Sequence, residues 1–275
     1  MSVSRLMQMG AAGVPVGWTD PDIANASYDS VNFDLNIAGN LRGMVFKPDG
    51  TKLFLSQDTT TSIKEYTMST AWDISTLSNT SNFSVSSELS SGQQGIFFKP
   101  DGYAFYLADA NGSRILEYSL STAWDLSTAS YSSSAFTTTG EYNPRSVHFK
   151  DDGTRMYVIG PGTDRVIQYN LSTAWDMTTA SSQANFSVAS QTTFPAQISF
   201  NPTGTKMYLT MYSVVITGDI FEYDLSTAWD ISSASYNSVS YNDSVLTGPW
   251  IHAFKSDGSK AYFIDDTDII YQYTT

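Results

Sequence analysis

Cysteine is missing from this chain, and histidine and basic residues are scarce. The 275 residues include two His, and 14 Lys or Arg against 27 Asp or Glu, which gives a formal net charge of −13. Without cysteine, disulfides, thiolate catalysis and cysteine-based zinc sites are excluded. An acidic protein repels phosphate, so we expect no nucleic-acid partner. No apolar run approaches the ~20 residues that cross a bilayer, so we expect no membrane insertion.

One internal repeat dominates the sequence. A phrase of the form Phe-x-x-x-Gly begins at Phe46, Phe98, Phe149, Phe200 and Phe254, and the phrase Ser-Thr-Ala-Trp-Asp follows the first four copies. The glycines of the first phrase are 52, 51, 51 and 54 residues apart. A unit of about 50 residues that is rich in short strands is typical of the blades of a β-propeller. We therefore predict four strands in each unit.

The two ends of the chain complement each other. The last unit stops after its third strand, whereas residues 22–33 repeat the fourth-strand sequence found at residues 230–241. An N-terminal strand can complete the last blade, which closes the ring and covers a sheet edge. We predict an all-β fold, a single five-bladed β-propeller with four-stranded blades over residues 18–275. Residues 1–17 precede it as a tail.

The turn within each unit relates the chain to a known repeat. Pro100, Asp101 and Gly102 lie in the phrase Gly-x-x-Phe-x-Pro-Asp-Gly-x-x-x-Tyr, which resembles the YVTN and lactonase-like propeller repeats. The resemblance implies the fold and places the strand before the turn innermost. It also implies that lactonases of this kind hold a metal with carboxylates and amides in the channel. The innermost strands here contain no Asp or Glu, so we expect no enzyme activity, metal or cofactor.

Positions that differ between repeats are better candidates for function than positions that every blade shares. One such ring lies at the entrance to the innermost strands and predicts a ligand site, and it consists of Arg42, Gln94, Arg145, Ala196 and Trp250. Arginine binds carboxylates through paired hydrogen bonds and tryptophan offers a stacking face, which suits a sugar or a carboxylate. The alternative is that these side chains plug the channel and bond to nearby carbonyls.

Two other segments are predicted to bind partners. The fourth repeat carries three extra residues near positions 210–219, where we expect exposed side chains at Met211, Tyr212 and Val214. Packing on the neighbouring blade is the alternative. The second segment is the tail, whose candidate contacts are Arg5, Leu6, Met7 and Met9.

The tail and the Ser-Thr-Ala-Trp-Asp repeats resemble virion proteins of tailed phages, particularly marine ones. This resemblance implies a noncatalytic module on the virion surface, either a capsid decoration or a tail- or fibre-associated adhesin. Its tail would bind other virion proteins. The alternative is a carbohydrate-binding propeller, viral or secreted, whose partners are host-surface glycans. A lactonase or other hydrolase is the third hypothesis.

The remaining polar candidates have structural interpretations. His148 and His252 precede the last phenylalanine of their innermost strands, and we expect them to pack between blades or to bond to the backbone. Asp265, Asp266 and Asp268 form the densest acidic cluster, which we interpret as a solvated loop. The aspartates of the repeated turns are expected to form the turns.

Overall fold

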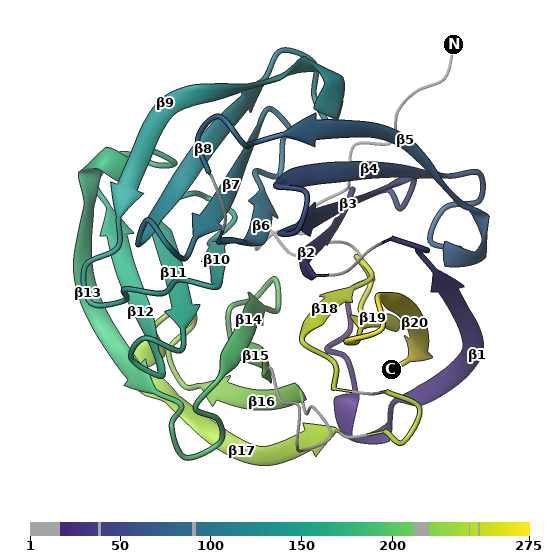
Figure 1. Ribbon diagram of the computed structural model, residues 1–275. Helices are drawn as coiled ribbons and strands as arrows, with labels where there is room; N and C mark the ends of the chain where they lie inside the picture. The colour runs from purple at the N-terminus through teal and green to yellow at the C-terminus, as the bar shows by residue number, and fades with distance from the viewer. Residues whose placement is uncertain (1–16, 38–39, 90–91, 212–219, 242, 247) are drawn as a thin grey trace.

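Five sheets stand in a ring around a common centre in the computed structural model (Figure 1). The structure describes residues 17–37, 40–89, 92–211, 220–241, 243–246 and 248–275. Each sheet has four antiparallel strands, so the predicted five-bladed β-propeller is confirmed. In these ranges no helix is long and apolar enough to cross a membrane.

The strands of a blade follow one another from the centre outward. Blade 1 contains β2 (Leu41–Phe46), β3 (Lys52–Gln57), β4 (Ser62–Met68) and β5 (Leu77–Ser84). Blade 2 contains β6 (Gln93–Phe98), β7 (Ala104–Asp109), β8 (Arg114–Leu120) and β9 (Ala129–Thr137). Blade 3 contains β10 (Ser146–Phe149), β11 (Arg155–Gly160), β12 (Arg165–Leu171) and β13 (Ala180–Ser187). Blade 4 contains β14 (Pro195–Phe200), β15 (Lys206–Met211), β16 (Ile220–Leu225) and β17 (Ala234–Tyr241).

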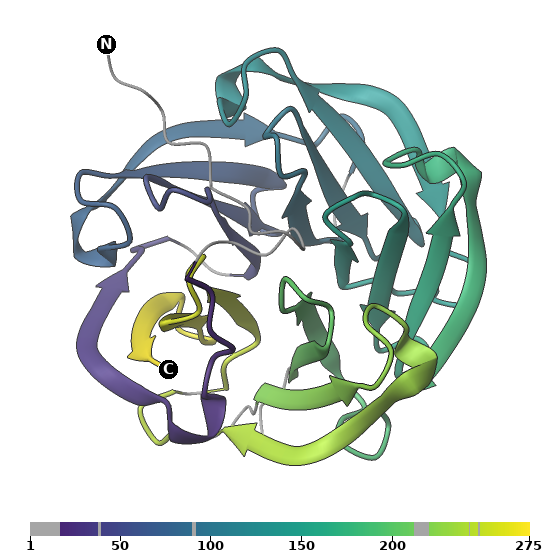
Figure 2. The ribbon, with the colours of Figure 1, turned by 180° about the vertical axis from the view of Figure 1, so that it is seen from behind.

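Blade 5 joins the two ends of the chain. It contains β18 (Ile251–Phe254), β19 (Lys260–Ile264), β20 (Ile269–Thr274) and, outermost, β1 (Ser27–Asp34). Strand β1 pairs antiparallel with β20, with Ser27 opposite Thr274. The carboxylate of Asp29 accepts a hydrogen bond from the Lys260 amine at 2.6 Å. The N-terminal strand therefore closes the ring as predicted, and the purple β1 runs beside the yellow strands of the last blade in Figure 2.

A short 3-10 helix leads into each outermost strand. In η2, the Asp73 side chain accepts the backbone N–H of Ser75, and the first residue, Ile74, is fully buried. The aspartate thus caps the turn while the apolar residue anchors it in the core. This explains why Asp and an apolar residue recur together at η1 (Ile23–Asn25), η2 (Ile74–Thr76), η3 (Leu126–Thr128), η4 (Met177–Thr179) and η5 (Ile231–Ser233).

The repeated turn and the repeated tryptophan form one unit. Gly50 has φ +73°, and a Cβ added to it would lie 2.3 Å from the Trp72 ring, so both the backbone and the space require glycine. Asp49 accepts the backbone N–H of Thr51 at 3.0 Å, which confirms its role as a turn former. Trp72 also stacks on Tyr262 of blade 5 with ring centroids 6.3 Å apart. The tryptophan therefore joins its own turn to the preceding blade.

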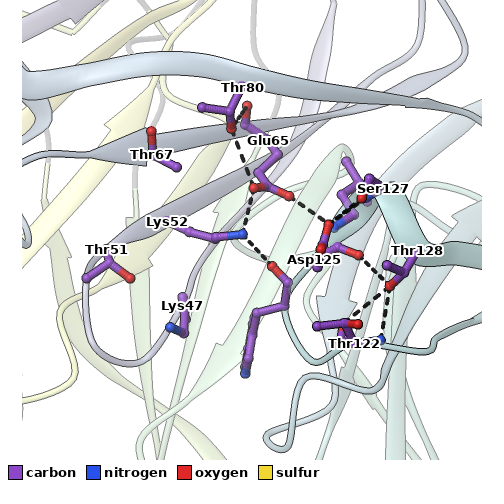
Figure 3. A network of polar contacts seen from close by, with 12 residues as sticks. Lys47, Thr51, Lys52, Glu65, Thr67, Thr80, Thr122, Asp125, Ser127 and Thr128 are labelled. Carbon is purple, nitrogen blue, oxygen red and sulfur yellow. Dashed lines mark hydrogen bonds and ion pairs between the residues drawn. The ribbon is translucent and has the colours of Figure 1, made fainter. Parts of the chain in front are cut away.

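Polar bonds strengthen the boundary between neighbouring blades. At the boundary of blades 1 and 2, the Lys52 amine bonds to the Glu65 carboxylate at 2.7 Å and to the Trp124 carbonyl at 2.8 Å. The other Glu65 oxygen accepts the backbone N–H of Leu126 at 3.0 Å. Figure 3 shows Lys52 and Glu65 facing the connection that leads into η3. Because these groups are largely buried, the network fixes how the two blades meet.

Candidate functional site

The five innermost strands begin at the same end of the ring, which we call the mouth face. The repeated glycine turns and tryptophans lie at the opposite end, which we call the turn face. The connections between blades also lie on the mouth face, because each blade has four antiparallel strands and its outermost strand therefore ends there. At the start of blade 3, the N–H of Arg145 bonds to the Ile159 carbonyl at the end of β11. This arrangement brings one residue from each blade to the mouth of the central channel.

The predicted ring of variable residues lines a single pocket. The pocket is bordered by Leu41, Arg42, Gln94, Arg145, Ala196, Trp250 and Ile251. Its empty volume, open mouth included, is about 200 Å³. That volume includes open solvent, and the enclosed part has room for about one water-sized group, so a ligand would lie across the mouth and stay mostly outside. The structure thus brings all five predicted positions together, while binding there stays a prediction.

Trp250 supports an arginine. The Arg42 guanidinium lies 4.6 Å from the centre of the Trp250 ring, a cation–π contact. Trp250 is only 6% exposed, and Arg42 covers one face of its ring. Asp58 lies 3.9 Å from Arg42 Nε and offsets part of its charge. The ring expected to stack on a ligand thus contacts Arg42, and ligand binding by Trp250 stays a prediction.

The strands that carry the pocket are held tightly by their backbones. The N–H of Gly95 bonds to the Arg145 carbonyl at 2.7 Å, and the Ser56 hydroxyl bonds to the Gln94 carbonyl at 2.6 Å. A Cβ on Gly43 would lie 2.7 Å from the Ile96 nitrogen, so glycine lets β2 and β6 approach this closely. The pocket residues of blades 1–3 therefore stand on a rigid base.

A Ser–His pair lies between blades 4 and 5, and its histidine, His252, is fully buried. The Ser199 hydroxyl is 2.6 Å from His252 Nε2, and the Thr210 hydroxyl is 3.3 Å from Nδ1. Gln197 bonds to both the N–H and the carbonyl of His252. Burial, together with the nearby His148, lowers the pKa of His252 to about 3. The expectation that His252 is packed and hydrogen-bonded between blades is thus confirmed.

His148 belongs to an aromatic cluster. Its ring lies 5.0 Å from the Phe97 ring and 5.3 Å from the Phe200 ring. Burial lowers its pKa to about 3 as well. Packing between blades is therefore confirmed for this histidine too.

Two other expectations are wrong where the structure describes them. Met211 is 8% exposed and packs in the core of blades 3 and 4, so it does not offer a surface to a partner. Asp265 and Asp268 are buried: Asp265 accepts the Thr267 N–H, and Asp268 accepts the Leu41 N–H. They hold the loop and its neighbour together and do not form a solvated acidic patch.

Several predicted partner residues lie outside the described part of the chain. Tyr212 and Val214 of the insertion belong to this group, as do Arg5, Leu6, Met7 and Met9 of the tail. Their proposed contacts stay predictions. Within the described ranges, no group of three or more His, Asp or Glu is arranged to hold a metal ion.

Sequence reasoning missed a set of exposed apolar side chains on the mouth face. Tyr142 is 67% exposed and Phe194 53%, and Val245 is also exposed. Each lies in a connection between blades, shortly before the pocket position of the next blade. The connections vary in length and fall outside the repeat, so no alignment of the units could single these residues out.

The fold and the pocket define the class as a five-bladed propeller with a small, arginine-lined mouth. Among solved structures, the chain is similar to a protein of unknown function from Desulfotomaculum acetoxidans, with 11% identity and a TM-score of 0.51 over 83% of this chain. It is also similar to a proposed 6-phosphogluconolactonase from Bacteroides uniformis, with 14% identity and a TM-score of 0.51 over 84% of this chain. The chain spans 66% and 65% of those two proteins. These likenesses show the fold alone.

No family model matches the sequence, and no curated protein matches it either. The similarity to the Bacteroides uniformis structure supports the resemblance to lactonase-like propellers at the level of the fold. The resemblance to phage virion proteins stays a prediction.

Proposed function

We propose that this protein is a noncatalytic binding module that holds an acidic group at the mouth of its channel. The observation that carries the proposal is the pocket itself, which is lined by Arg42 and Arg145 from two blades together with Gln94. Guanidinium groups bind carboxylates through charge-assisted hydrogen bonds. In a chain with a net charge of −13, two arginines in one small pocket are a local exception.

The geometry of the Ser–His pair supports a binding role over a hydrolytic one. A histidine that activates serine must accept a proton, and a carboxylate on its other nitrogen normally stabilises the charged ring. His252 Nδ1 faces the Thr210 hydroxyl instead, and burial lowers the pKa of the ring to about 3. The charged form is therefore strongly disfavoured at neutral pH, which makes His252 a poor general base.

The place where the module acts rests on sequence resemblance alone. The virion surface is the proposed setting, with residues 1–17 as the anchor to other virion proteins, and a secreted carbohydrate-binding propeller is the alternative. Both settings are compatible with an acidic group as the ligand at the mouth.

Ligand-observed NMR with glucuronic acid tests the proposal directly, with glucose as the uncharged comparison. We expect saturation transfer to glucuronic acid and none to glucose. Arg145→Gln is expected to weaken binding by at least about tenfold, because a hydrogen bond to a charged group contributes ~1.5–3 kcal/mol. Lys150→Gln removes one positive charge on the turn face, where Lys150 pairs with Asp152, and should leave binding unchanged.

Two results would contradict the proposal. The first is glucuronic acid binding that Arg145→Gln and Lys150→Gln reduce equally, since the attraction would then come from overall charge. The second is hydrolysis of 6-phosphogluconolactone, the substrate class suggested by the name of the Bacteroides uniformis protein, at a rate that Ser199→Ala abolishes.

A further inference from the structure

Tyr142 is exposed to an unusual degree for a large side chain in this protein. It is 67% exposed, and it precedes the pocket residue Arg145 by three positions on the same connection. It therefore lies on the mouth face, in the connection that leads to the pocket residue of blade 3. Tyrosine is enriched at binding interfaces because it combines an apolar ring with a polar hydroxyl.

The connection that presents Tyr142 is firmly anchored. Glu141 is fully buried, and its carboxylate accepts the backbone N–H groups of Asn143, Gly162 and Thr163 at 2.8, 3.1 and 3.2 Å. The Thr163 hydroxyl adds a fourth bond at 2.9 Å. A carboxylate that accepts four hydrogen bonds holds both turns in one arrangement.

The Tyr142 ring itself is also positioned. A Cβ added to Gly162 would lie 3.1 Å from Tyr142 Cδ2, which shows that the ring rests against the glycine backbone. Pro144 follows in the connection and is buried. A rigid aromatic ring loses little conformational entropy on binding, which is why such rings are effective recognition residues.

We propose that Tyr142 is a second contact point for the ligand and stacks on a neutral sugar unit next to the acidic unit held at Arg145. This inference rests on the proposed function and deepens it. The enclosed part of the pocket has room for about one water-sized group, so a ligand held at Arg145 must lie across the mouth face. A tyrosine ring offers an apolar face to the C–H groups of a pyranose and a hydroxyl to its edge.

The charge of the protein restricts the ligand further. A chain with a net charge of −13 repels a polyanion, so a glycan with one terminal acidic sugar and neutral neighbours fits better than an acidic polymer. The ligand class is therefore an oligosaccharide that ends in a single acidic unit.

Calorimetric titration with three related probes tests this inference. Glucuronic acid supplies the acidic unit alone, xylobiose supplies neutral units alone, and aldotriouronic acid joins one glucuronate to two xyloses. We expect aldotriouronic acid to bind about three- to tenfold more tightly than glucuronic acid, as one stacking contact provides. Xylobiose should show no measurable binding.

Variants separate stacking from other effects. Tyr142→Ala should remove the gain of the trisaccharide and leave glucuronic acid binding unchanged, whereas Tyr142→Phe should retain most of the gain. Tyr103→Ala is the matched control, because Tyr103 is a 52% exposed tyrosine on the turn face. Both positions are at the surface, so folding is expected to be intact in all three variants.

The outcomes distinguish the inference from the proposed function. If glucuronic acid binds and aldotriouronic acid binds no more tightly, the role of Tyr142 is overturned and the proposed function stands. If succinyl-trialanine, which carries a carboxylate without sugar, equals the trisaccharide, the sugar specificity is overturned. If neither acid binds, the proposed function itself fails.

Discussion

The two faces of the ring follow opposite rules. On the turn face, four blades repeat the same tryptophan and all five repeat the same glycine. The two residues contact each other in the four blades that have both, and Gly258 of blade 5 faces Thr19 instead. On the mouth face, the pocket position is filled by a different residue type in most blades, with arginine occurring twice. In this repeat protein, the residues that recur in every unit build the scaffold. The positions that differ between units are the candidates for the functional site.

The largest expected effect comes from breaking the scaffold of the turn face. Trp124 stacks on Phe98 with ring centroids 5.0 Å apart and reaches Phe54 of blade 1 at 6.0 Å. Trp124→Ala should lower the free energy of unfolding by ~3–5 kcal/mol in urea titration, because a large buried ring leaves a cavity. Tyr142→Ala on the mouth face should stay within ~0.5 kcal/mol of the parent. Equal effects would contradict the division between the faces.

A smaller effect should separate two tyrosines at equivalent positions. Tyr157 donates a hydrogen bond to the Trp229 carbonyl, whereas the buried Tyr208 hydroxyl has no partner among the described residues. The residue before the capping aspartate is Trp229 at η5 but Pro21 at η1. Pro21 therefore takes the place of the tryptophan for Tyr208. Tyr157→Phe should cost ~1 kcal/mol by thermal unfolding.

Tyr208→Phe is the more informative of the two substitutions. Removing a buried hydroxyl that has no partner should leave the stability unchanged or raise it slightly, because no hydrogen bond is lost. A loss as large as that of Tyr157→Phe would show that Tyr208 bonds to a group outside the described residues.

The smallest effect on stability should come from giving blade 2 a lysine at a position where blades 1 and 4 have one. Blades 1 and 4 pair a lysine with a buried glutamate, as Lys52 does with Glu65, but blade 2 has Ala104 beside Glu117. Burial raises the pKa of Glu117, and the nearby Asp176 raises it further. Ala104→Lys should therefore stabilise the protein by ~0.2–1 kcal/mol at neutral pH.

The pH dependence has a definite sign. Because the pKa of Glu117 is higher in the folded state than in the unfolded state, the folded state binds more protons between those two values. Its contribution to stability is therefore present at low pH and is lost as pH rises through the folded pKa. Ala104→Lys should flatten this loss in unfolding measured from pH 4 to 8, and an unchanged profile would count against the pairing.

Most of the fold could be predicted from the sequence because each device is local and repeated. Each of three local sequence features identifies one structural element: the glycine turn, the capping aspartates and the fourth-strand sequence at residues 22–33. The blade shared by both ends of the chain follows from the number of strands that each unit supplies. The pocket ring was also predicted, since its position is fixed relative to Phe46 and its counterparts. These inferences needed only register within a unit.

The rest depends on contacts between blades. The cover that Arg42 forms on Trp250 joins blades 1 and 5, and no pattern within a unit encodes it. Burial of Asp265 and Asp268 likewise depends on neighbouring backbone groups, so a charge pattern alone gave the wrong environment. Tyr142 was missed because its connection lies outside the repeat.

Backbone hydrogen–deuterium exchange, with and without saturating glucuronic acid, tests the assignment of function to the mouth face most directly. Binding stabilises the amides around its site by an amount set by ligand concentration over Kd. We predict slower exchange in residues 41–43, 93–95 and 141–146, with no change in the turns at residues 47–51 and 150–154. Slower exchange confined to the turn face, or none on the mouth face while glucuronic acid binds, would contradict the account.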